Sequence, residues 1–365
     1  MEKKVILSVL SFALTFLCAQ ASDSWVVNNE GDTIWYDFNE SAKTASVTFK
    51  GEYPSQHEEY AGAISIPEEI MYNQEIYRVT TIGEKTFFAC KGLTNAIIPN
   101  SVSTIGKEAF KNCKSLTNVN IPNSVTTIGE QAFADCEKLT SMDIPNSLTT
   151  VESGTFRDCK KLTSVNIRSG VKTIGMEAFK NCKSLSNINI PNSVTSIGES
   201  AFYHCDSLTN INMPNSVKSI GRGAFAYCKK LVNVTIPNSL TTIESQCFWD
   251  CRSLKSIIIP NSVKSIENSV FSGCLSLTEI NIPNSVKSIG QSAFSLCHNL
   301  ISITLPNSLT TIESHCFWGC GSLNSITIPD NVTVIKRQAF YGCDGLTSIN
   351  IPDGVKTIGK EAFFD

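Results

Sequence analysis

The chain has 365 residues, of which 42% are hydrophobic and 17% are charged, and its formal net charge is −3 at pH 7. This composition is that of a folded protein and not of a disordered one. The weak negative net charge does not suggest a nucleic-acid partner. Length gives no domain count here, because a repeat of fixed period governs most of the sequence.

The N-terminus has the anatomy of a secretory signal peptide. A short positive start precedes an apolar run over residues 5–17, and a small-residue cleavage site ends at Ala21. We predict a signal peptide over residues 1–21, cut after Ala21, and a secreted or cell-surface mature chain. Cys18 raises the alternative of a lipoprotein anchor, but the large Leu17 before it favours soluble export. The mature chain has no stretch apolar enough to span a membrane.

Residues 22–62 precede the repeat. The apolar clusters 25–27 and 34–36 and the alternating pattern over 45–49 predict a β-rich N-terminal cap. An open coil end needs such a cap, because it would otherwise expose apolar side chains and unpaired strand edges.

Cysteines recur every 23 residues from Cys90 to Cys343, and we call them the ladder cysteines. A phenylalanine stands three residues before each of them, from Phe87 to Phe340, and a leucine stands three residues after each. Fixed spacing of this kind predicts a solenoid, in which equivalent side chains of successive coils stack in columns. We expect it to cover residues 63–365 in about thirteen units.

The unit over residues 116–138 shows how one coil is expected to fold. Alternating Val119 and Ile121 predict a short strand with one buried face, which proline 122 ends. A second short extended stretch follows around residues 125–128. Ala132, Phe133 and Cys136 have helical spacing, which predicts a short helix or helical turn. The expected fold is therefore an α/β repeat solenoid.

The unit L-x-x-V-x-I-P-x-x-V-x-x-I-G-x-x-A-F-x-x-C-x-x resembles the BspA-like, Treponema pallidum-type leucine-rich repeat, and the match covers about Ile64 to Asp365. The resemblance implies a right-handed leucine-rich-repeat superhelix. It also implies a secreted or surface adhesin, because members of that family are implicated in binding host matrix proteins and in cell-to-cell aggregation. A repeat scaffold carries different partners in different members, so the ligand does not follow from the resemblance.

The chain stops at Asp365, in mid-unit after Phe363. This end predicts a frayed last coil, self-association through an uncapped C-terminal coil, or a natural chain that continues.

The cysteine column could form disulfides in an exported protein. Side chains stacked one coil apart point in parallel and not toward each other, so we favour buried free thiols. Cys247 with Cys251, and Cys316 with Cys320, have a spacing that could place two metal ligands together. Zinc needs four ligands, and the two pairs lie three coils apart, so we favour core packing and expect no metal or cofactor.

Outward-facing positions of the predicted strands carry asparagine. Such a polar ladder could bind an extended peptide or a glycan through many hydrogen bonds. The alternative is a soluble face whose amides bond to each other. The candidate residues are Asn118, Asn120, Asn187, Asn189, Asn210 and Asn212.

A second set of candidates stands two residues before the ladder cysteine, which we call the aromatic position. Exposed aromatic side chains are enriched at binding hot spots. The alternative is that the rings fold back over the turns. The aromatic residues at this position are Phe88, Tyr203, Trp249, Trp318 and Tyr341.

No catalytic motif is present in the sequence, and the four histidines stand at unrelated positions, which is typical of solvated surface residues. We therefore expect a non-enzymatic, adhesin-like protein that binds an extracellular protein or glycan, such as a host matrix protein or a molecule of another cell. The alternative is a structural spacer or self-assembling module without its own ligand.

Overall fold

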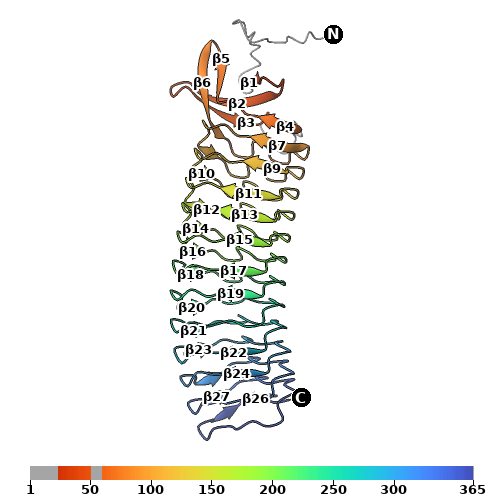
Figure 1. The fold of residues 1–365 in the computed structure, drawn as a ribbon, viewed down its shortest axis with the longest axis vertical. Helices are drawn as coiled ribbons and strands as arrows, with labels where there is room; N and C mark the ends of the chain where they lie inside the picture. Colours follow the sequence, from red (N-terminus) through yellow and green to blue (C-terminus); the bar gives the residue numbers. More distant parts are fainter. Residues whose placement is uncertain (1–23, 51–59, 365) are drawn as a thin grey trace.

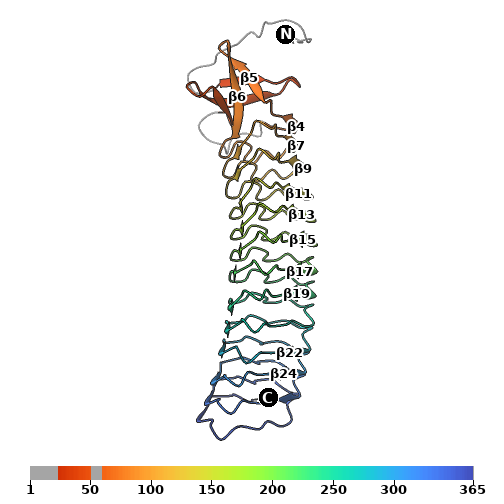
Figure 2. The ribbon, with the colours of Figure 1, turned by 60° about the vertical axis from the view of Figure 1, so that its left-hand side comes forward.

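The computed structural model describes residues 24–50 and 60–364, which form one elongated column of stacked coils (Figure 1). The predicted signal peptide lies outside the described residues. The N-terminal strands lie at one end of the column and the last coils at the other, and the view in Figure 2 shows the same straight stack. The expectation of a leucine-rich-repeat solenoid with coils of 23 residues is confirmed.

Strands β1 (Ser24–Val27), β2 (Thr33–Asn39) and β3 (Thr44–Thr48) form an antiparallel meander at the N-terminal end. Strand β5 (Glu69–Tyr72) forms a hairpin with β6 (Glu75–Ile82). Strand β3 pairs in parallel with β6, and β6 pairs in parallel with β8 (Thr104–Ile105) of the coil that follows. The meander therefore covers the strand edge that the first coil would otherwise expose.

Most coils contribute one strand to a first parallel ladder, whereas the coil of Cys274 contributes only an isolated bridge between Ile258 and Thr235. Outer positions of the ladder alternate with buried ones, as in β9, where Val119 is buried between two exposed asparagines. The strands of this ladder are β4 (Gly62–Ser65), β7 (Leu93–Ile97), β9 (Asn118–Asn120), β11 (Ser141–Ile144), β13 (Ser164–Ile167), β15 (Asn187–Asn189), β17 (Asn210–Asn212), β19 (Asn233–Thr235), β22 (Glu279–Asn281), β24 (Ser302–Thr304) and β26 (Ser325–Ile326).

A second ladder of two-residue strands follows the turn after the first ladder, a turn that proline begins in most coils. The second residue of each of these strands is an isoleucine or valine, and in most coils it points into the core, as Ile128 does. The strands are β8 (Thr104–Ile105), β10 (Thr127–Ile128), β12 (Thr150–Val151), β14 (Thr173–Ile174), β16 (Ser196–Ile197), β18 (Ser219–Ile220), β20 (Thr242–Ile243), β21 (Ser265–Ile266), β23 (Ser288–Ile289), β25 (Thr311–Ile312), β27 (Val334–Ile335) and β28 (Thr357–Ile358).

In every coil of the described residues, the segment between the second strand and the ladder cysteine contains no helix. The prediction of a short helix there is wrong. In the coil of Cys113, Glu108 and Asn112 have left-handed φ angles of 53° and 63°. The equivalent residues of the other coils are left-handed too. Two left-handed residues four positions apart interrupt a right-handed helix.

Hydrogen bonding in this segment alternates between the coil itself and the next coil. The amide of Lys111 donates to Glu108 O within the coil at 3.1 Å, whereas the amide of Phe110 donates to Ala132 O of the next coil at 2.7 Å. An α-helix would direct all of these amides along its own axis. The segment is therefore a series of β-turns joined to its neighbours, and every coil is made of strands and turns.

The phenylalanines form a continuous column through the core. Successive rings lie nearly parallel, with centroids 5.3 Å apart between Phe179 and Phe202 and again between Phe202 and Phe225. At the N-terminal end, Tyr60 places its ring edge against Phe87 at 4.8 Å. Stacking in this register buries apolar surface that no single coil could bury, and so holds the coils together.

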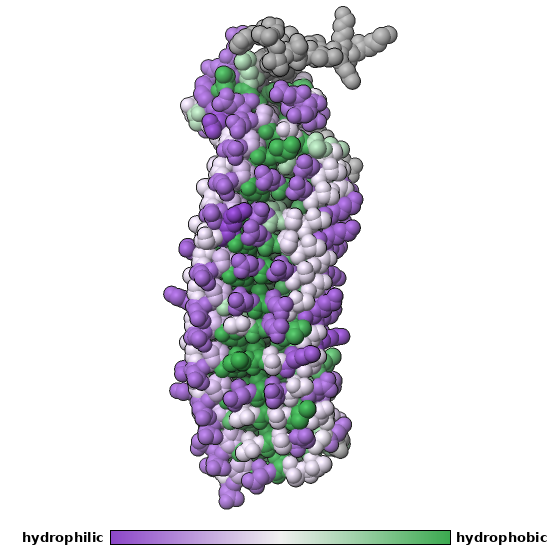
Figure 3. All heavy atoms as spheres, in the orientation of Figure 1, coloured by the Kyte–Doolittle hydropathy of each residue, from purple (hydrophilic) through white to green (hydrophobic). Residues whose placement is uncertain are grey.

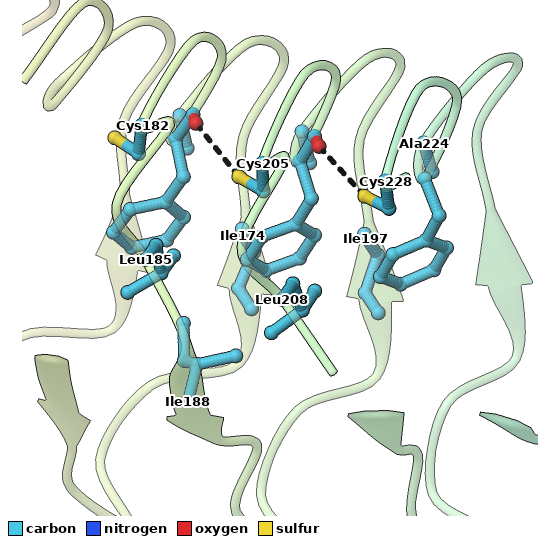
Figure 4. Packing of buried hydrophobic residues seen from close by; sticks show 14 of the residues in the cluster. Ile174, Cys182, Leu185, Ile188, Ile197, Cys205, Leu208, Ala224 and Cys228 are labelled. Carbon is cyan, nitrogen blue, oxygen red and sulfur yellow. Dashed lines mark hydrogen bonds between the residues drawn. The ribbon is translucent and has the colours of Figure 1, made fainter. Parts of the chain in front are cut away.

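The ladder cysteines bond from coil to coil. Cys205 Sγ lies 3.3 Å from Phe179 O of the preceding coil, and Cys228 Sγ lies 3.3 Å from Phe202 O, as the dashed lines in Figure 4 show. All fourteen cysteines of the described residues are buried and none is assigned to a disulfide, which agrees with the buried-thiol interpretation. Cys247 and Cys316 fill buried positions that alanine occupies in other coils.

Candidate interaction surface

The exposed side of the first ladder forms what we call the strand face, made of the outward positions of β9 and its equivalents. The strands pair in register, so Asn210 lies beside Asn233, and Asn212 beside Thr235. All six candidate asparagines are exposed on this face, in β9, β15 and β17. Some amides bond between coils, as Asn233 Nδ2 donates to Asn210 Oδ1 at 2.7 Å.

The strand face is mostly polar and carries few charges, although the exposed Ile97 and Ile258 stand at the position of Asn120 in their coils. Arg168 and Asp143 form an ion pair at 3.6 Å beside Asn120. These residues border an open hollow of about 280 Å³ that Asn100 and Asn123 also line. Arg168 stands where the repeat normally has proline, so the hollow lies at a departure from the repeat. In the view of Figure 3, visible hydrophobic residues form a narrow band along the column, with polar residues on both sides.

The aromatic position lies on the turn segment of each coil, and its rings are half-buried there. The first group of rings surrounds Tyr203. Tyr227 contacts Tyr203 edge-on at 5.3 Å and stacks on His204 at 4.4 Å, and Trp249 contacts Tyr227 at 4.8 Å. Lys180 Nζ lies 5.5 Å from the centre of the Tyr203 ring. The group is thus packed against itself, and burial raises the pKa of Tyr227.

The second group contains Trp318 and Tyr341. Their ring centroids are 6.3 Å apart at 27°, and Tyr341 stacks on Phe364 at 5.5 Å. An open hollow of about 470 Å³ lies beside Trp318, and His315 and Gln338 contribute to its lining. Phe88 lies at the same position in the coil of Cys90, far from both groups along the column.

The sequence did not single out several residues that the structure adds to these groups. Tyr227 and His204 stand one residue before the ladder cysteine, at the second left-handed position of the turn segment. His315 and Gln338 stand at the first left-handed position of that segment. His204 and His315 are half-buried in the aromatic groups, so their assignment as solvated surface residues is wrong. The recurrence of polar and aromatic residues at the left-handed positions was the available signal.

The described residues contain no group of three or more histidine, cysteine or acidic side chains placed to hold a metal ion. None of these residues forms a helix that is long and apolar enough to cross a membrane.

Family comparison agrees with this architecture. The sequence matches the BspA type leucine rich repeat region, in six copies, over residues 80–208, 149–278, 195–320 and 264–365. The chain belongs to this BspA-type family. Proteins of the family are typically found at the cell surface, and the match indicates no catalytic family.

Solved structures of other leucine-rich-repeat proteins resemble the column. A leucine rich cell surface protein from Faecalibacterium prausnitzii A2-165 shares 32% identity with a TM-score of 0.63, covering 95% of this chain and 93% of its own. A leucine-rich repeat protein from Bacteroides ovatus shares 29% identity with a TM-score of 0.62, covering 89% and 98%. The pneumococcal vaccine antigen PcpA, at 19% identity, a TM-score of 0.54 and coverage of 94% and 86%, shares the fold. Comparison with curated proteins found no match.

Proposed function

We propose that this BspA-type protein is exported and acts at the cell surface as an adhesin-like protein, binding an extended segment of an extracellular protein through its strand face. The observation that carries the proposal is the strand face itself, where exposed and mostly polar side chains lie in register from coil to coil. The similarity to a leucine rich cell surface protein supports the proposed location.

Repeated weak hydrogen bonds along the column would together hold a partner. Each exposed amide offers two donors and one acceptor oxygen. One such hydrogen bond adds only about 1 kcal/mol to binding, because it replaces a bond to water. A partner laid along several coils repeats the bond at each coil, and twelve coils at about 4.8 Å give a face of roughly 55 Å. A standard protein interface of about 800 Å² per partner fits on such a face.

The test is binding of the purified mature chain to a panel of host matrix proteins, mucins and microbial surface proteins, followed by interferometry. We expect at least one member of the panel to bind. The double variant Asn189→Arg and Asn212→Arg should weaken that binding about tenfold or more, because the arginines project into the centre of the interface. Glu199→Arg adds the same side chain to the turn segment of the coil of Cys205 and serves as the control. A blank panel, or equal binding by all variants, would refute the proposal.

A structural spacer is the second candidate, and the uniformity of the coils favours it. It predicts concentration-dependent self-association in light scattering and no binder in the panel. A strict monomer that binds a panel member would remove this candidate.

A further inference from the structure

The residue at the aromatic position differs from coil to coil, and where large rings give way to serine a recess is left. Trp318, Tyr341 and Phe364 place three nearly parallel rings in consecutive coils. The two coils before Trp318 carry Ser272 and Ser295 at this position, and both serines are buried. The row of rings therefore ends at Trp318, and the hollow of about 470 Å³ lies where the next ring would have been.

The walls of this hollow combine aromatic and polar groups, and no lysine, arginine or carboxylate is among them. Trp318 and Tyr341 provide the rings. The other lining residues carry amide, hydroxyl and imidazole groups, and they are Gln291, Ser292, Ser295, His315 and Gln338.

The polar side chains on one side are held in place by one another. His315 Nε2 lies 2.8 Å from Gln338 Oε1, and Gln338 Nε2 donates to Glu361 Oε2 at 2.6 Å. The bonds fix the Gln338 amide, which reduces the entropy that a ligand must remove when it binds. The Glu361 carboxylate is engaged by the amide and lies outside the lining.

We propose that this hollow is a binding site for a neutral pyranose ring within a glycan chain. A pyranose has an apolar C–H face that packs on an aromatic ring and a rim of hydroxyls that bond to amides and hydroxyls. Pockets of this kind pair an apolar wall with a few placed polar groups. The hollow is open along the surface, so a longer chain can pass through it with one ring on Trp318.

The charge of the lining selects among ligand classes. No lysine or arginine lines the hollow, so phosphates of a nucleic acid and carboxylates of an acidic glycan lack a counter-ion there. The group around Tyr203 differs, because Tyr227 and His204 fill the space beside the Tyr203 ring and Lys180 lies over it. The glycan site is therefore assigned to Trp318 and not to every aromatic group.

This site lies on the turn segments and is independent of the strand face of the proposed function. The test is an array of neutral and acidic oligosaccharides probed with the mature chain, followed by calorimetry on the neutral binders. We expect binding to a neutral glycan that added salt does not weaken, because no ion pair forms. We expect Trp318→Ala to weaken it roughly tenfold or more, by analogy with the loss of other rings that stack on a ligand.

A second variant tests the recess without removing the tryptophan. Ser295→Phe continues the row of rings into the hollow and should abolish glycan binding. Trp249→Ala, at the aromatic position of the first group, is the matched control and should bind as the unchanged chain does. Circular dichroism and thermal melting verify the fold of each variant.

The proposal is overturned if no neutral glycan binds, if the ligands are acidic glycans or nucleic acids, or if binding survives both Trp318→Ala and Ser295→Phe. Its failure is separable from that of the proposed function, because the strand-face variants Asn189→Arg and Asn212→Arg leave this hollow intact.

Discussion

A glycine follows the second strand in most coils because the preceding coil lies very close to it. A Cβ atom on Gly221 would lie 2.4 Å from Glu199 N and 2.7 Å from its Cα, and backbone atoms of a packed coil cannot move aside easily. Neither Gly221 nor its equivalent Gly198 has a positive φ, so the requirement is one of space and not of backbone conformation.

Gly221→Ala should therefore destabilise the fold. We expect the free energy of unfolding to fall by about 1–3 kcal/mol, the usual cost of overpacking. Glu244 occupies the equivalent position one coil later and already carries a side chain, so Glu244→Ala should change stability by less than about 0.5 kcal/mol. Urea unfolding monitored by tryptophan fluorescence measures both. Equal effects of the two variants would contradict the close-approach argument.

The strands could be predicted from the sequence, but the turn segment could not. Val119 and Ile121 alternate and are followed by proline, a pattern that only a strand satisfies well. Ala132, Phe133 and Cys136 have a spacing that a helix and a row of β-turns share, since both return a side chain to the core after three or four residues. Amide pairing with the next coil decides between them, and that pairing is a property of the stack.

The thiol column is an element whose chemistry depends on burial. Burial raises the pKa of the ladder thiols well above their ordinary value, and neighbouring thiols raise it further, as at Cys182 and Cys205. An unfolded chain has a thiol pKa of about 8.5. Below that pH both states keep their protons. Above it the unfolded state loses protons that the folded state retains, so unfolding becomes more favourable.

We therefore expect the free energy of unfolding, measured under reducing conditions, to fall progressively above about pH 8.5, by up to about 1.4 kcal/mol per pH unit for each thiol. A triple variant with Cys182, Cys205 and Cys228 changed to alanine should be less stable at pH 7 but should show a shallower alkaline decline, by about three protons. Urea midpoints at a series of pH values measure this. An identical slope in the variant would show that other groups cause the decline.

At the scale of the whole molecule, the column separates its possible contacts onto two surfaces. The strand face could be predicted from the sequence, because exposed asparagines follow from strand alternation. The hollow beside Trp318 could not, since it depends on the small Ser295 in the preceding coil, on His315 in the coil of Trp318 and on Gln338 in the following coil. Aligning the aromatic position of successive coils would have shown two serines between Trp249 and Trp318.

Coils stacked in register are the basis of both surfaces, and distances along the strand face test this stacking most directly. Spin labels carried by unnatural amino acids, which avoid the native thiols, are placed at Asn118 and at one equivalent exposed residue: Asn210, Ser256 or Ser302. These lie four, six and eight coils away by the 23-residue period. At about 4.8 Å per coil, pulsed electron spin resonance should give about 19, 29 and 38 Å. Distances that stop increasing with the number of coils would contradict the stacked column.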